Sequence, residues 1–333
     1  VDWLARHVPA GGTVAVDGHV LGLAMAQLLQ RTLDAAKVTL RTDLDVVDAV
    51  WPDRAGLPTP PVYEHRAPHA PLPRTAKLAK LREAMARHGA THHWVSTVDD
   101  IAWITNLRGA DVDYNPVFLA HLLVDLTGAT LFVAEGKVDA ALAATLASDG
   151  LAVRPYAQAL PTLAALPDGA VLLIDPKRVT YGARQQVGAG VKVVESINPS
   201  TLAKSLKSAE EAAFIRETMA QDGAAMCEFY AWFEAALGRE PITELTVDEK
   251  LSAARAKRPG FVGLSFSTIA GFNANGAMPH YRATPSSFAA IDGDGLLLID
   301  SGGQYVGGTT DITRVWKIGE ITPAMKRDFT LVL

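Results

Sequence analysis

A cluster of prolines between Pro52 and Pro73 is the feature that most constrains how this chain can fold. Seven prolines fall within this short segment, and proline lacks the amide hydrogen that a regular helix or a central strand requires. The segment is therefore predicted to be a linker. A chain of 333 residues is long enough for two domains, or for two domains and a fragment, so at least one linker is expected.

Residues before this linker show the pattern of α/β structure. Thr13–Asp17 and Val38–Thr42 have the short apolar runs of strands, and Val20–Leu33 has the period of a helix. The same order recurs downstream, where GAVLLIDP echoes GTVAVDG. The echo suggests that residues 1–62 are the C-terminal part of a domain that resembles the one after the linker.

Residues 63–198 are predicted to form that second α/β domain. Expected helices and strands alternate: helices at Lys77–His88 and Lys137–Leu146, strands at His92–Ser96, Val117–Asp125 and Ala129–Ala134. This alternation favours a mixed sheet covered by helices. The domain is expected to end near Asn198-Pro199.

Residues 199–333 are predicted to form a third domain. A capping box at Ser208–Glu211 opens a long amphipathic helix, and a second one at Thr246–Glu249 opens another. The apolar face expected for the first helix comprises Ile215, Met219, Met226, Phe229, Phe233 and Leu237. After Pro259-Gly260 the pattern changes to strands and glycine-rich loops that continue to Ile318.

Composition excludes several functional classes. Hydrophobic residues make up 49% and charged residues 20%, as in an ordinary globular protein. The net charge of −5, without a dense basic run, argues against DNA or RNA as a partner. The apolar stretches are far shorter than the roughly 20 residues that span a bilayer. With no signal-like start and with Cys227 as the single cysteine, we expect a cytoplasmic protein outside the membrane.

The strongest chemical pattern is LLLIDSGGQYVGGTTDITR, from Leu296 to Arg314. An apolar strand ends at Asp300 and a second strand carries Asp311, which predicts a hairpin. If its centre lies between Tyr305 and Val306, the two carboxylates stand opposite one another, with Cβ atoms about 5 Å apart. A close pair of like charges needs a shared proton or a cation, and two metal ions would suit the spacing. The alternative is that both aspartates are solvated turn residues.

A histidine precedes this hairpin. His280 follows the glycine-rich segment GFNANGAMP, where its imidazole could face a cleft. A lone histidine is more often a structural residue, and the loop around it could be only a tight connection. Residues alone therefore leave the role of His280 open.

Three segments carry a resemblance to a known family. FVGLSFSTIAGFNANGAMPHY and LLLIDSGGQYVGGTTDITRVWKIGEIT resemble the catalytic domain of aminopeptidase P, the Xaa-Pro aminopeptidases of the pita-bread metallopeptidases. DDIAWITNLRGADVDYNPVF, from Asp99 to Phe118, resembles a signature of the long, three-domain form of these enzymes. The resemblance implies an α/β and α+β multidomain fold. Residues 1–62 would be part of a first creatinase-like domain, 63–198 a second one, and 199–333 the first part of a pita-bread catalytic domain.

The resemblance also implies an activity and its residues. Asp300 matches the first metal-ligand aspartate of the family, and Asp311 matches the second, which bridges two metal ions, usually Mn²⁺. His280 matches the histidine beside the substrate. The implied reaction removes the N-terminal residue from a peptide with proline in second position, by attack of a hydroxide that bridges the metals. A homodimer is expected.

The family's remaining ligands, a histidine and two glutamates, have no counterpart before Leu333. A helix that begins at Thr322-Pro323 has no C-terminal cap in the sequence, and the chain opens at Val1. The sequence is therefore expected to be part of a longer protein and to be inactive alone. Three alternatives stay open: a prolidase-type dipeptidase, a metal-free creatine-hydrolysing relative, and a non-catalytic domain that binds peptides or histones.

Two further groups of polar residues are weaker candidates for a functional role. Arg108 and Asp111 lie together in the signature segment, where an ion pair between them would hold the loop. By resemblance this loop helps to close a dimer or narrows the way into the active site. His92 and His93 adjoin on an expected strand, so their side chains point to opposite faces and cannot bind one ion together.

Overall fold

The computed structural model describes residues 1–333, which form two compact units. Unit 1 comprises residues 1–66, 72–111 and 117–206, and unit 2 comprises residues 67–71, 112–116 and 207–333. Two short segments from the first two-thirds of the chain thus belong to the second unit. The predicted domain limits after residues 62 and 198 stay a prediction.

The start of unit 1 has the predicted order of strand, helix and strand. Its elements are α1 (Asp2–His7), β1 (Thr13–Ala15), α2 (Leu23–Ala35), β2 (Thr39–Arg41) and α3 (Val46–Val50). The two strands pair in parallel, and a small core around Leu29, Leu33 and Val38 joins them to α2. The helix begins three residues later than expected because Gly22, its N-cap, is in an extended conformation.

The rest of unit 1 is the predicted mixed sheet covered by helices. The six strands have the order β10-β9-β4-β6-β7-β8 and comprise β4 (His92–Val95), β6 (Ala120–Asp125), β7 (Ala129–Val133), β8 (Leu151–Pro155), β9 (Val171–Ile174) and β10 (Lys192–Glu195). Pairing is antiparallel for β4 with β6 and β6 with β7, and parallel elsewhere. The proline-rich segment forms only β3 (Tyr63–Glu64), which pairs with β5 (Leu107–Arg108).

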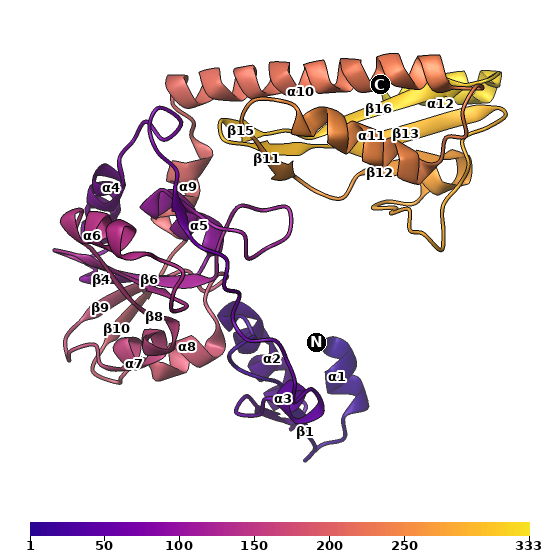
Figure 1. The fold of residues 1–333 in the computed structure, drawn as a ribbon. Helices are drawn as coiled ribbons and strands as arrows, with labels where there is room; N and C mark the ends of the chain where they lie inside the picture. Colours follow the sequence, from indigo (N-terminus) through magenta and orange to yellow (C-terminus); the bar gives the residue numbers. More distant parts are fainter. The chain divides into compact units, whose positions relative to one another are not determined.

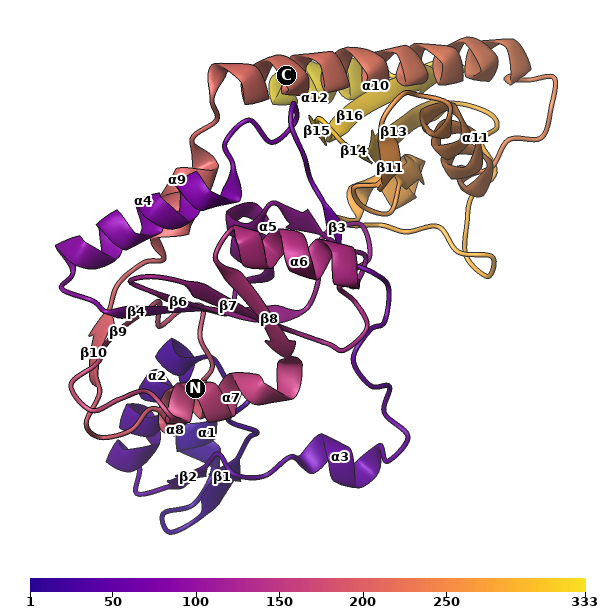
Figure 2. The same cartoon turned by 60° about the vertical axis from the view of Figure 1, so that its left-hand side comes forward.

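Helices cover both faces of this sheet (Figure 2). One face holds α4 (Arg74–Arg87), α5 (Val98–Thr105) and α6 (Ala140–Ser148), and the other holds α7 (Ala159–Ala164) and α8 (Tyr181–Gln186). Two apolar cores result, one around Leu81, Ile101 and Leu122 and the other around Trp94, Phe132 and Leu172. Unit 1 ends with α9 (Pro199–Ser205).

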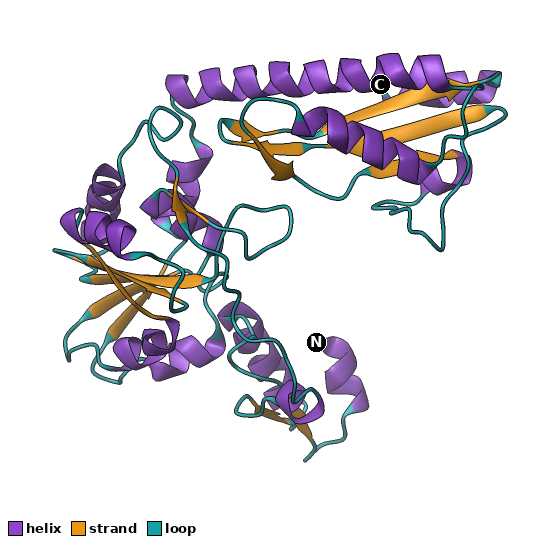
Figure 3. Cartoon of the chain, viewed as in Figure 1, coloured by secondary structure: helices purple, strands orange, loops and turns teal.

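Unit 2 places two helices beside antiparallel strands (Figures 1 and 3). The helices are α10 (Ala209–Ala236) and α11 (Glu244–Ala256), and α12 (Pro323–Val332) follows the strands. One sheet comprises β12 (Ile269–Phe272), β13 (Gly295–Ser301) and β16 (Ile312–Ile318), and a second comprises β11 (Phe261–Leu264), β14 (Gly303–Tyr305) and β15 (Gly308–Thr309). Their core includes Phe229, Phe233, Leu251, Leu297 and Ile299.

The two long helices of unit 2 start at capping boxes, as predicted, but with one shift. The Ser208 box is confirmed, whereas the second box is formed by Thr243 with Thr246, so α11 begins one turn before the expected start. Thr246 is the third helical residue, and its hydroxyl accepts a hydrogen bond from the Thr243 amide while its own amide donates to Thr243 Oγ1. None of the helices in the structure is long and apolar enough to cross a membrane.

The buried face of α10 also differs from the expected one. Met226, Phe229 and Phe233 are buried, whereas Met219 is 40% exposed. Asp222 is buried in its place, although its charge marks it as a surface residue in the pattern. The face has rotated toward Asp222 because this carboxylate has buried partners from other elements.

Candidate metal centre

The end of β13 and the start of β16 bring Asp300 and Asp311 together. In the pairing of these strands Asp300 lies opposite Thr313, and Asp311 immediately precedes β16. The expected direct opposition of the two aspartates is therefore wrong. The turn consists of Val306 and Gly307, so the register is displaced by two residues and the aspartates become diagonal neighbours. Since side chains alternate with a period of two, this displacement keeps both on one face of the sheet.

The environment of Asp311, which includes the Asp300 carboxylate, raises its pKa. Desolvation raises the pKa of Asp311, and repulsion from Asp300 and a hydrogen bond with it raise that pKa further. The Thr313 hydroxyl donates to Asp300 Oδ1 at 2.8 Å, which orients this carboxylate. No arginine or lysine forms an ion pair with either aspartate. The negative charge of the pair is thus left for a proton or a cation to neutralise.

A close approach of the chain to itself supports this pair. A Cβ atom at Gly302 would lie 2.0 Å from the Thr310 carbonyl oxygen, so no other residue fits there. Ser265 Oγ donates to the same oxygen at 2.8 Å, and the Gly303 amide donates to Thr310 Oγ1 at 2.8 Å. These contacts hold the strand after Asp300 against the strand before Asp311.

Behind the hairpin lies a buried ion pair that the sequence pattern did not reveal. Arg255 Nε donates to Asp222 Oδ1 at 2.7 Å, and the Tyr305 hydroxyl donates to the same oxygen at 2.7 Å. Burial raises the pKa of Tyr305, and its bond to Asp222 raises it further. Because Tyr305 precedes the turn of the hairpin, the pair anchors the hairpin to α10 and α11. A buried charge at a helical position gives no local signal of its partner.

His280 does not form a group of potential metal ligands with the two aspartates. It is exposed on the segment between η2 (Asn273–Ala277) and β13, in a left-handed conformation with φ +58°. In residues 1–333 no group of three or more histidine, cysteine, aspartate or glutamate side chains is arranged to hold a metal ion. The structure therefore unites Asp300 with Asp311 but adds no third ligand to them.

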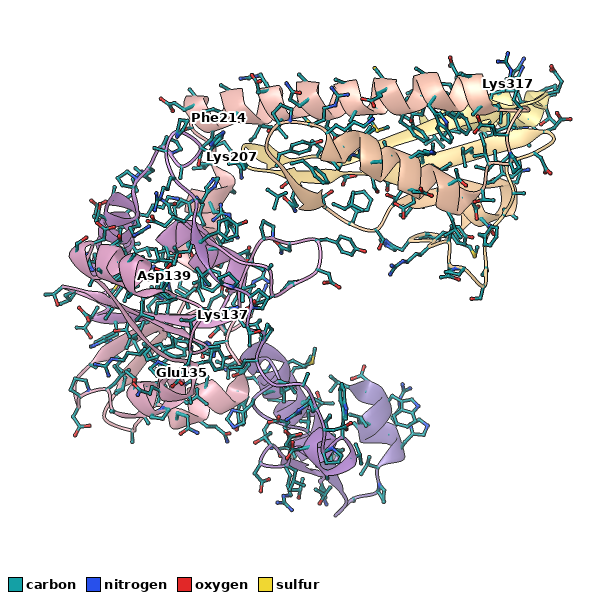
Figure 4. All side chains as sticks on the ribbon, viewed as in Figure 1. Glu135, Lys137, Asp139, Lys207, Phe214 and Lys317 are labelled. Atoms are coloured by element: carbon teal, nitrogen blue, oxygen red, sulfur yellow. The ribbon has the colours of Figure 1, made fainter.

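Arg108 and Asp111 of the signature segment have partners other than those expected. Asp111 does not pair with Arg108 but with Lys137, whose side chain is fully buried. Arg108 instead donates to the carbonyl oxygens of Ala102 and Leu107, each at 2.9 Å. Lys137, labelled in Figure 4, also donates to the Pro60 carbonyl oxygen at 2.7 Å. The expected pair of Arg108 with Asp111 is wrong because the actual partner, Lys137, is distant in the sequence and is brought to Asp111 only by the fold.

The neighbouring histidines of β4 have separate environments. His93 is buried, and its Nδ1 contacts the Leu173 carbonyl oxygen at 3.0 Å. Burial lowers its pKa, which keeps the ring neutral. His92 is partly exposed, and its Nδ1 contacts Thr91 Oγ1 at 2.9 Å. The two rings have no common partner.

These features define a class of two-domain protein. An α/β domain with a mixed sheet is followed by a domain of antiparallel strands and helices, whose hairpin carries two aspartates. Residues 53–211 match the Creatinase/Prolidase N-terminal domain, and residues 213–333 match Metallopeptidase family M24. The chain thus combines a domain of the Creatinase/Prolidase N-terminal type with a pita-bread domain of metallopeptidase family M24. The predicted fold class is thereby confirmed.

Individual relatives match the chain from end to end. It is 34% identical to a probable Xaa-Pro aminopeptidase P of Talaromyces marneffei and 35% identical to one of Coccidioides posadasii. All of this chain is covered, but only 52% and 56% of those proteins, so the chain spans about half the length of these curated relatives.

Solved structures show the same fold. The X-prolyl aminopeptidase of Caenorhabditis elegans, described as a cytosolic enzyme with a di-nuclear active site, superposes with a TM-score of 0.89 at 26% identity, over 97% of this chain and 54% of that one. The Xaa-Pro dipeptidase of Bacillus anthracis superposes at 0.60 with 17% identity, over 78% of this chain and 69% of that one, and shows the fold alone. The resemblance to the aminopeptidase P family is confirmed.

Proposed function

We propose that the protein is a metal-dependent aminopeptidase that removes the N-terminal residue from peptides with proline in second position. The observation that carries this proposal is the Asp300 and Asp311 pair, which lies on the M24 hairpin without a cation of its own. Its relatives of comparable sequence over the whole chain are named Xaa-Pro aminopeptidase P, which supports this substrate class.

The two carboxylates fit a pair of divalent metal ions. Carboxylate oxygens are hard ligands that suit Mn²⁺, and a cation would remove the repulsion that raises the pKa of Asp311. In this proposal Asp300 and Asp311 are the residues that would hold the two ions. When bound, such ions lower the pKa of water and polarise the carbonyl of the substrate. The di-nuclear centre described for the C. elegans enzyme supports the number of ions, and Mn²⁺ is our proposal for their identity.

Other residues of the hairpin and its neighbouring loop would orient the reacting groups. Thr313 orients the Asp300 carboxylate through its 2.8 Å hydrogen bond to Oδ1, and this carboxylate would help to hold a metal ion. His280 would form a hydrogen bond near the scissile amide, a role that rests on the family resemblance. An exposed ring is suited to contact a substrate that arrives from solvent.

Metal analysis and peptide hydrolysis test this proposal together. We expect the protein, in its full natural length, to contain two divalent ions and to cleave tripeptides and longer peptides of the Xaa-Pro type. An otherwise identical peptide with alanine in second position is the control. Cleavage of Xaa-Pro dipeptides alone would identify a prolidase, and metal-free protein without hydrolysis would identify a binding domain.

His280→Ala is expected to keep both ions and to lose at least about a hundredfold in kcat, because it removes a polar group beside the reaction and not a ligand. Loss of metal in this variant would contradict the assigned role.

The proposal also covers the oligomeric state and the cellular location. A homodimer follows from the family resemblance and is tested by measuring the mass in solution. The cytoplasm is supported by the description of the C. elegans enzyme as cytosolic.

A further inference from the structure

A single buried carboxylate organises the segment that carries His280. Glu244, the first residue of α11, is fully buried. Its oxygens accept hydrogen bonds from neutral donors only: the amides of Phe272 and Ala289 at 2.8 Å each, Asn275 Nδ2 at 3.0 Å, and the Tyr281 hydroxyl at 2.8 Å. No arginine or lysine forms an ion pair with it.

The positions of these donors attach the segment from Phe272 to Ala289 to the Glu244 carboxylate. Phe272 is the last residue of β12 and Ala289 lies near the end of the segment, while Asn275 and Tyr281 lie between them. A buried carboxylate without a counterion is tolerated only while several donors surround it. Loss of any one donor therefore weakens the attachment of the entire segment, from η2 to the approach to β13.

His280 depends on this attachment because it has a costly backbone conformation. A non-glycine residue with φ +58° costs on the order of 1 kcal/mol and persists only when its surroundings impose it. Its side chain is exposed, and the next residue, Tyr281, is bound to Glu244. Burial, followed by the contact with Glu244, raises the pKa of Tyr281 to about 12, so its hydroxyl remains a donor at neutral pH.

We propose that Glu244 and Tyr281 are positioning residues that hold His280 in the conformation required for catalysis. This inference rests on the proposed function, in which His280 contacts the substrate. It assigns Glu244 no contact with the substrate and no proton transfer. The predicted consequence is that removing the Tyr281 hydroxyl affects catalysis through His280 alone.

A double-mutant cycle in the full-length protein tests this consequence. Tyr281→Phe is expected to lower kcat about tenfold, with metal content unchanged and KM within about twofold, because one hydrogen bond to a charged group is lost. In a His280→Ala background the same substitution should have less than about a twofold effect. Tyr230→Phe, which removes a hydroxyl from α10, is the matched control and should change neither constant. Glu244→Gln would leave donors facing an amide group, so Tyr281→Phe is the informative variant.

Hydrogen exchange supplies a measurement that does not require activity. Amides of residues 273–288 should exchange faster in Tyr281→Phe than in the unsubstituted protein, while those of α10 stay unchanged. Equal losses of kcat in both backgrounds, or unchanged exchange, would overturn the inference while leaving the proposed function intact. Failure of the unsubstituted protein to cleave Xaa-Pro peptides would overturn both.

Discussion

Carboxylates in the two units are neutralised in opposite ways. In unit 1 the buried Asp111 pairs with the buried Lys137, and three positions of the chain are joined by this contact because Lys137 also binds the Pro60 carbonyl oxygen. In unit 2 Asp300 and Asp311 are diagonal neighbours without a partner cation, and desolvation followed by repulsion from Asp300 raises the pKa of Asp311. The first arrangement is complete within the chain, whereas the second has no partner cation in the chain and can accept an ion or a proton.

The buried carboxylates of unit 2 do have partners within the chain, which sharpens this contrast. Asp222 has Arg255 and Tyr305 as partners, and Glu244 accepts hydrogen bonds from four residues between Phe272 and Ala289. The unsatisfied pair is therefore confined to the hairpin that the family comparison marks as part of the M24 domain. Where a domain satisfies its structural charges but leaves one pair exposed to a ligand, that pair is the candidate site.

The largest expected effect is on activity. Asp311→Ala in the full-length protein should abolish hydrolysis of Xaa-Pro peptides, a loss of at least about a thousandfold in kcat/KM, because a bridging carboxylate neutralises two cations. Asp300→Ala should behave similarly. In metal-free protein, unfolding by denaturant should show no loss of stability, since the substitution relieves repulsion. A variant with full activity and full metal content would show that the aspartates are scaffold residues.

The opposite result is expected in unit 1. Asp111→Ala leaves Lys137 buried without its counterion, which should lower the free energy of unfolding by about 3 to 5 kcal/mol. Asp113→Ala, at an exposed position of the same loop, is the control and should have little effect. Denaturant unfolding of both variants measures the difference. Equal stability would mean that the ion pair with Lys137 has no structural role.

Lowering the pH should also affect unit 1 selectively. Burial lowers the pKa of His121 to about 4, against an ordinary value of about 6.5. Between these values the unfolded chain binds a proton that the folded chain does not, so stability is lost as the pH falls from about 6.5 to about 4, by up to about 3 kcal/mol. Neither histidine of unit 2, His69 or His280, is buried.

Exchange of amide hydrogens at several pH values can separate the two units. Amide protection of the six-stranded sheet should decrease as the pH is lowered through this range. His121→Gln should weaken this pH dependence of protection, because glutamine does not titrate. A pH dependence that persists unchanged in this variant would assign the effect to other groups, among which the buried His93 is the first to examine.

The smallest expected effect concerns the support behind the hairpin. Tyr305→Phe removes one hydrogen bond to the buried Asp222 but leaves its pair with Arg255, so a loss of about 2 kcal/mol in stability is expected. Metal content should change little, because Tyr305 is not a ligand. Thermal unfolding with metal analysis checks both statements, and a strong loss of metal would show that the hairpin register depends on this bond.

Local patterns in the sequence determined the elements and much of the candidate site. The Ser208 capping box, the interruption of structure by the prolines, the mixed sheet and the strand that carries Asp300 all follow from periods and caps within a few residues of one another. The aspartate pair could be predicted because both residues lie on one hairpin. The role of His280 stays a prediction, since it rests on family resemblance.

Tertiary structure alone decided the contacts between distant residues. It displaced the hairpin register by two residues, paired Asp111 with Lys137 rather than Arg108, and buried Asp222 and Glu244 among partners from other elements. The residues next to a charged side chain in the sequence do not show whether it is solvated or buried. The cost of burying it is offset by hydrogen-bond donors, and these can be distant in the chain. Only packing brings those donors within hydrogen-bonding distance.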